Sequence, residues 1–87
     1  MEVYYMNGIK ESVLNKLAEK FSVHLTESQY DTNFFSPRVG LFARNFIDLI
    51  YEIEGEKNIV FDEKTLMNPD FCTFNGFVKE IEERLIG

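Results

Sequence analysis

Two residues with reactive side chains occur only once in this chain of 87 residues, Cys72 and His24. A single cysteine cannot form an internal disulfide, and a single histidine cannot complete a histidine-rich metal site. We therefore expect Cys72 to be a partly buried, small apolar side chain beside Phe71, with a reactive thiol as the alternative. We expect His24 to have a loop or packing role rather than a catalytic one.

No other group of residues has the pattern of an active site. The acidic residues fall on exposed helix positions rather than in a pair suited to general acid and base catalysis. A glycine-rich loop that could hold a phosphate is also missing. We therefore expect no enzyme, no bound metal and no resident cofactor.

Charge and composition restrict the class of protein. Fifteen acidic residues against nine basic ones give a net charge of -6, which repels nucleic acid and favours protein partners with a basic surface. No apolar run approaches the ~20 residues of a membrane-spanning helix. The first residues, MEVYYMNGIKE, lack the basic and apolar regions of a signal peptide, so we expect a cytoplasmic protein. The length and the 45% apolar content predict one packed, monomeric domain over residues 1–87.

Helical periodicity predicts the first half of the fold. Residues 1–6 alternate weakly and suggest an extended N-terminal arm, after which Asn7 can cap a helix that ends near Phe21. A long connection, 23–40, follows, and we expect Phe34 and Phe35 to anchor it to the core. A second helix is predicted from about residue 41 to residue 57. Its expected inward residues are Phe42, Phe46, Leu49, Ile50 and Ile53.

Capping residues predict the second half. Asn58 tolerates the left-handed conformation that ends helices, and Asp62 can cap a short helix over 63–67. Thr73 can cap the last helix, in which Gly76 suggests a close contact with a neighbouring element. Its expected inward residues are Phe74, Phe77, Val78, Ile81 and Leu85. The prediction is an all-α bundle of three long helices and one short helix, with a long first loop.

Two segments of the chain resemble the acyl carrier protein family, which includes D-alanyl and peptidyl carrier proteins. In GLFARNFIDLIYEIEGEKNIVF, residues 40–61, Gly40-Leu41 is similar to the Gly-Leu turn before the family's second helix. The end of that helix, residues 53–59, is similar to the family's LEEEFGI pattern. In NPDFCTFNGFVKEI, residues 68–81, FCTF is similar to the F-x-T-[VI] entry into the last helix. The resemblance spans about residues 9–85 and implies the carrier-protein fold.

The resemblance also implies a serine at the start of the second helix, which in the family carries 4'-phosphopantetheine. Helix amides and the helix dipole accommodate the phosphodiester there. Counting back from Ile59 places Ala43 at that position, and counting forward from Gly40 places Arg44 there. Neither is a serine, and the acidic residue that precedes the serine in the family is also missing. The interpretation is a docking or adaptor protein of a bacterial biosynthetic or peptide-maturation system, without this cofactor at the usual position.

Charged residues around the second helix are the candidate docking residues. Acids on this helix are typical of carrier proteins that bind basic patches of enzymes, where they steer the encounter. Arg44 with Arg38 could in addition hold a phosphate without a covalent bond. The predicted docking residues are Arg38, Arg44, Asp48, Glu52 and Glu54.

Two alternatives remain open. In the first, Ser36 is a displaced attachment site for 4'-phosphopantetheine in a working acyl or aminoacyl carrier, rather than a turn residue before Pro37. In the second, the chain binds a small anionic or lipid ligand at the opening of the second helix and among the phenylalanines of the interior.

Overall fold

The computed structural model describes residues 2–86, and the surroundings of side chains from Gly8 to Ile86. Its helices are α1 (Glu2–Phe21), α2 (Ala43–Lys57), α3 (Glu63–Leu66) and α4 (Phe74–Ile86), with 3-10 turns at Glu27–Gln29 and Pro69–Cys72. Residues 2–86 contain no β-strand, only an isolated bridge between Asn33 and Thr73. The predicted all-α bundle of three long helices and one short helix is therefore confirmed.

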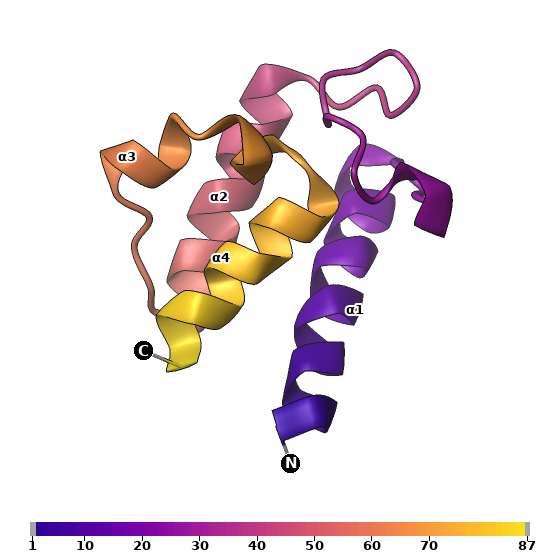
Figure 1. Cartoon of the computed structure of the whole chain (residues 1–87). Helices are drawn as coiled ribbons and strands as arrows, with labels where there is room; N and C mark the ends of the chain where they lie inside the picture. Colours follow the sequence, from indigo (N-terminus) through magenta and orange to yellow (C-terminus); the bar gives the residue numbers. More distant parts are fainter. Residues whose placement is uncertain (1, 87) are drawn as a thin grey trace.

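The long helices form a small bundle in which α1 runs opposite to α4 (Figure 1). The long first loop crosses the top of the bundle in this view, and α3 lies to one side between α2 and α4 along the chain. Both ends of the chain lie at the bottom of the same view. None of the helices in the described part of the chain combines the length and apolar character that crossing a membrane requires.

The start of α1 corrects one prediction. Residues 2–6, predicted as an extended arm, are helical, and Asn7 lies inside the helix instead of capping it. The alternation of a few residues was too short to indicate a strand. Neither Asn7 nor Gly8 blocks the helical hydrogen bonds as a proline would, since glycine costs only about 1 kcal/mol in a helix. Met1 lies outside the described residues. From Ile9 onward the predicted inward positions Ile9, Val13 and Leu17 are buried.

The start of α2 corrects another prediction. Phe42 was expected to point inward, but its side chain is 70% exposed. The helix begins only at Ala43, and Phe42 precedes it with extended backbone angles. Neighbouring residues in extended backbone point to opposite sides, so Leu41 is buried and Phe42 faces outward. The other inward residues, Phe46, Leu49, Ile50 and Ile53, are buried as predicted.

Three predicted helix ends are confirmed by their caps. Asn58 ends α2 in the left-handed conformation, with φ 58° and ψ 48°. The side chain of Asp62 accepts a hydrogen bond from the backbone N–H of Thr65 at 2.8 Å. The hydroxyl of Thr73 accepts one from the N–H of Gly76 at 3.0 Å. Each cap satisfies a backbone group that the helix itself leaves free.

One continuous apolar core joins all these elements. Phe34 from the long loop is fully buried, and its ring lies 5.4 Å from Phe46 and 6.4 Å from Phe77 between centroids. Phe35, predicted as its fellow anchor, is instead 43% exposed and meets only the edge region of the core at Phe46. The phenylalanines of the core pack against each other, as expected for core residues rather than a cofactor site.

Candidate functional site

The position of the family's serine lies at the exposed beginning of α2. Ala43 is the first residue of this helix, and both Ala43 and Arg44 are exposed. No side chain caps the helix, and its first turn contains no acidic residue. The surface is therefore accessible, but Ala43 has no group that could be phosphorylated or acylated.

Ser36 has a structural role in the turn that ends the long loop. Its hydroxyl accepts a hydrogen bond from the N–H of Arg38 at 3.2 Å. Its carbonyl accepts two more, from Val39 at 2.9 Å and from Gly40 at 2.8 Å. The side chain is half-buried and lies seven residues before α2 begins. This is the environment of a turn residue, and it lacks the helix amides that would hold a phosphodiester.

The two arginines near the start of α2 remain exposed. Arg38 contributes only backbone groups to the loop, and its carbonyl accepts a hydrogen bond from Gln29 Nε2 at 3.1 Å. Within the part of the chain that the structure describes, neither Arg38 nor Arg44 forms an ion pair. Both guanidinium groups are thus available to a partner.

The predicted docking acids separate into two groups. Asp48 is exposed and has no ion pair within residues 8–86. Glu52 instead binds Lys16 and Lys20 of α1 at 3.4 Å and 3.3 Å. Glu54 accepts a hydrogen bond from the backbone N–H of Phe61 at 2.9 Å. The structure therefore engages Glu52 and Glu54 inside the molecule, and it leaves Asp48 as the free acid of the predicted set.

A seam of charges between α1 and α2 explains why Glu52 is engaged. Lys16 of α1 also binds Glu56 at 2.8 Å, and Ser12 donates a hydrogen bond to the same carboxylate. The hydrogen bond from Lys16 holds the pKa of Glu56 below its usual value, and the same bond raises the pKa of Lys16. This side of α2 therefore belongs to the bundle rather than to a partner.

The outer face of α2 carries apolar residues that the sequence reasoning missed. Ile47 is 49% exposed and Tyr51 is 68% exposed, and they are neighbours on the helix surface at spacing i, i+4. With Phe42 they form an apolar strip that is flanked by Arg44 and Asp48. We call Phe42, Ala43, Arg44, Ile47, Asp48, Tyr51 and Gly55 the outer face of α2. The signal was present in the sequence, because Ile47 and Tyr51 lie opposite the predicted inward residues.

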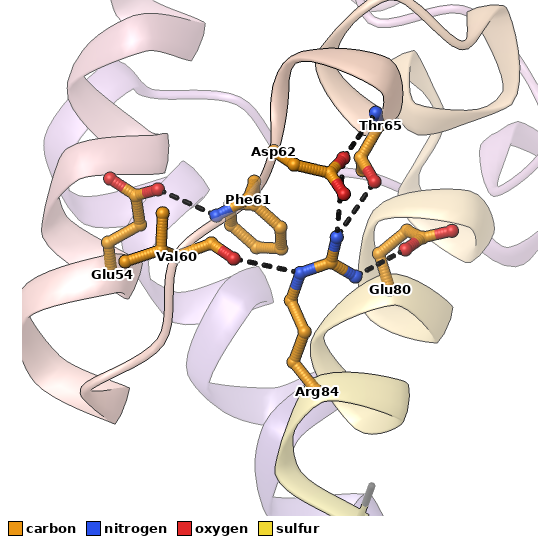
Figure 2. A network of polar contacts seen from close by, with 7 residues as sticks. All are labelled: Glu54, Val60, Phe61, Asp62, Thr65, Glu80 and Arg84. Atoms are coloured by element: carbon orange, nitrogen blue, oxygen red, sulfur yellow. Dashed lines mark hydrogen bonds and ion pairs between the residues drawn. The ribbon is translucent and has the colours of Figure 1, made fainter.

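The connector after α2 is fixed by Arg84 of α4 (Figure 2). Its guanidinium donates to the carbonyl of Val60 at 3.0 Å, to Glu80 at 2.6 Å and to the hydroxyl of Thr65 at 2.8 Å. It also lies over the ring of Phe61, at 5.1 Å from its centroid. The connector that follows the docking helix is therefore held against α4 at several points.

The remaining candidates from the sequence contribute no site. His24 is exposed, while Cys72 is partly buried as predicted, and burial raises the pKa of its thiol. The described residues hold no group of three His, Cys, Asp or Glu side chains that could bind a metal. A polar cleft of about 420 Å³ lies at the start of α4, remote in sequence from α2. It is lined by Asp31, Asn68, Asp70, Phe71, Thr73, Asn75, Gly76, Lys79 and Glu80.

Comparison with protein-family models, with curated proteins and with solved structures finds no match for this chain. The functional argument therefore depends on the geometry of α2 and on the family resemblance of the sequence.

Proposed function

We propose that this chain is a docking protein related to acyl carrier proteins, which binds a protein partner through the outer face of α2. The observation that supports the proposal is the exposure of Phe42, Ile47 and Tyr51 beside the free acid Asp48. Exposed aromatic and apolar residues on one helix face are typical of interaction sites. The family relation and the setting, a bacterial biosynthetic or peptide-maturation system, are supported only by the sequence resemblance.

The partner should present an apolar groove bordered by basic residues. The apolar strip supplies contact area, while Asp48 and the net charge of -6 favour a positively charged surface. Arg44 at the beginning of α2 adds a contact for one acidic group and fixes the direction in which the helix lies. In the complex, a single copy of the chain acts as the docking unit.

The absence of a serine at Ala43 and Arg44 supports a role without covalent cargo. The test is the intact mass of the protein after incubation with coenzyme A and a broad-specificity phosphopantetheinyl transferase. We expect no gain for the natural chain, with a carrier protein modified in the same tube as control. The variants Ala43→Ser and Arg44→Ser provide internal controls, since either serine restores the family's residue at one of the two aligned positions. A gain that Ser36→Ala abolishes would replace this proposal with the carrier alternative.

Docking itself is tested by mutating the outer face. A photoreactive amino acid in place of Tyr51 captures the partner in the native host, and the captured protein is then purified for binding measurements. We expect Ile47→Glu and Asp48→Lys each to weaken binding at least about tenfold, as residues central to an interface do. The matched controls are Ile86→Glu and Glu83→Lys, which make the same changes at exposed positions of α4. Equal binding by all four variants would contradict docking through α2.

A further inference from the structure

We propose that the outer face of α2 also binds a second copy of this chain, with the two α2 helices antiparallel. The resulting weak dimer covers the apolar strip of the free protein until a partner replaces the second copy. The replacement step rests on the proposed function, whereas the self-association does not. The monomer expected from the sequence is, in this proposal, the partner-bound form.

The residues of the outer face are arranged symmetrically about position 49. Arg44 and Glu54 lie five residues on either side of it, and Ile47 and Tyr51 lie two residues on either side. In an antiparallel pair related by a two-fold axis, each residue faces the one equally distant on the other side. Arg44 therefore faces Glu54 of the second copy, and Ile47 faces Tyr51. Each of these contacts occurs twice.

Both charged groups are available for such a pair. Arg44 is exposed, and Glu54 uses Oε2 for the N–H of Phe61 but has no hydrogen bond to Oε1 within residues 8–86. Arg44 lies in the first turn of α2 and Glu54 in its last turn, so the antiparallel arrangement also aligns the helix dipoles favourably. The two opposite-charge pairs select this direction over a parallel one, in which Arg44 would face Arg44.

The apolar centre and the small ends of the face suit close contact between helices. Ile47 and Tyr51 supply the exposed apolar surface at the middle. Ala43 and Gly55 lie equally far from position 49 and face each other in the pair. Gly55 has open space around it, so the second helix meets no bulky side chain at this end.

The size of the face predicts that the dimer is weak. A helix of 15 residues is about 22 Å long, and one face of it falls well short of the ~800 Å² per partner of a stable interface. Two copies with a charge of -6 also repel each other, and Asp48 of both copies lies on the same side of the axis. We therefore expect a dissociation constant of about 10⁻⁴ M, weak enough for a partner to displace the second copy.

The test is sedimentation velocity of the full chain from 10 µM to 1 mM in about 0.15 M salt, where exposed charges interact only over ~8 Å. We expect the average mass to rise from the monomer's 10.2 kDa toward twice that value. Arg44→Glu and Glu54→Arg should each weaken self-association at least about tenfold, because each places like charges opposite one another twice. An equimolar mixture of the two variants should form a heterodimer at least as tight as the natural dimer, since both charge pairs are then restored.

Matched variants separate this proposal from general effects of charge and folding. Lys10→Glu on α1 has the same net charge as Arg44→Glu and should dimerise like the natural chain. If Glu54→Arg fails to fold because the N–H of Phe61 loses its acceptor, Ile47→Glu mixed with Tyr51→Arg tests the same register without Glu54. Asp48→Asn should weaken docking to a partner but leave self-association intact or stronger, which distinguishes the two proposals.

Two results would overturn the inference. One is a mass that stays at that of the monomer up to 1 mM. The other is a mixture of Arg44→Glu and Glu54→Arg that remains as monomeric as its components while both variants are folded by circular dichroism. Neither result depends on whether a docking partner is found.

Discussion

Gly55 and Gly76 both lie inside helices, yet their surroundings differ. A Cβ added at Gly55 of α2 would meet no atom within 4 Å. A Cβ added at Gly76 of α4 would lie 1.7 Å from the backbone carbonyl oxygen of Asp70, which cannot rotate away. The first turn of α4 therefore lies directly against the 3-10 turn that precedes it, and only glycine permits this approach.

This contrast gives a matched pair of substitutions. Gly76→Ala should lower the free energy of unfolding by about 2 kcal/mol or more, because the overlap outweighs the better helix propensity of alanine. Gly55→Ala should raise it by up to about 1 kcal/mol, since only the propensity changes. Urea denaturation at 10 µM protein measures both. A stabilised Gly76→Ala variant would show that the two backbone segments are not in contact in solution.

Individual residues also show what the sequence could predict. The caps at Asn58, Asp62 and Thr73 were predictable because each depends on local backbone chemistry. The directions of Phe35 and Phe42 were not, because each lies in a loop or at a helix boundary where no period fixes the side of the chain. The inward residues of α2 could be predicted, and so could the exposed Ile47 and Tyr51 on its opposite side.

At the scale of elements, two polar networks determine which sides of α2 and α4 belong to the bundle. Glu52 and Glu56 hold α2 against Lys16 and Lys20 of α1, and Arg84 holds the connector against α4 (Figure 2). The sequence shows that Glu52 is polar and outside the core. It does not show that the flank of α2 carrying Glu52 meets another helix, because that depends on how the helices pack. Part of the predicted docking set was therefore assigned to a surface that the bundle uses itself.

The charge seam predicts a pH dependence of stability. Because the pKa of Glu56 is lower in the fold than its usual value of about 4.3, its ionised form stabilises the fold above that pH, and this contribution is lost as the pH falls through the lowered pKa. Glu56→Gln should thus lower the free energy of unfolding near neutral pH by up to about 1 kcal/mol. The difference from the natural chain should shrink in acid. Urea unfolding at pH 7 and pH 3 measures it, with Glu83→Gln as control.

Lys16 contributes at the other end of the pH range. Its raised pKa means that the ion pair stabilises the fold below the usual lysine value of about 10.4, and that this contribution is lost as the pH rises through the raised pKa. A constant difference between the natural chain and Glu56→Gln from pH 3 to pH 11 would contradict the role of this seam.

At the scale of the whole molecule, the long first loop is part of the core rather than a connection over its surface. The N–H of Phe34 donates to the carbonyl of Cys72 at 2.7 Å, and its carbonyl accepts from Leu41 at 3.0 Å. Tyr30 lies against Phe74, with ring centroids 4.5 Å apart. A loop this long without helices of its own needs such anchors in a small domain. The sequence predicted that an anchor was needed, but the long-range contacts that select Phe34 arise only from the arrangement of α2 and α4.

Because loop and helices share one core, they should unfold together. Phe34→Leu should lower the free energy of unfolding by about 1–3 kcal/mol, since it leaves a void among buried rings. The same change at the adjacent, largely exposed Phe35 should cost at least about 1 kcal/mol less. In both variants, helix content by far-ultraviolet circular dichroism and the tyrosine signal of Tyr30 should change at the same urea concentration. An earlier transition of the tyrosine signal would mean that the loop detaches first, and the core would then consist of the helices alone.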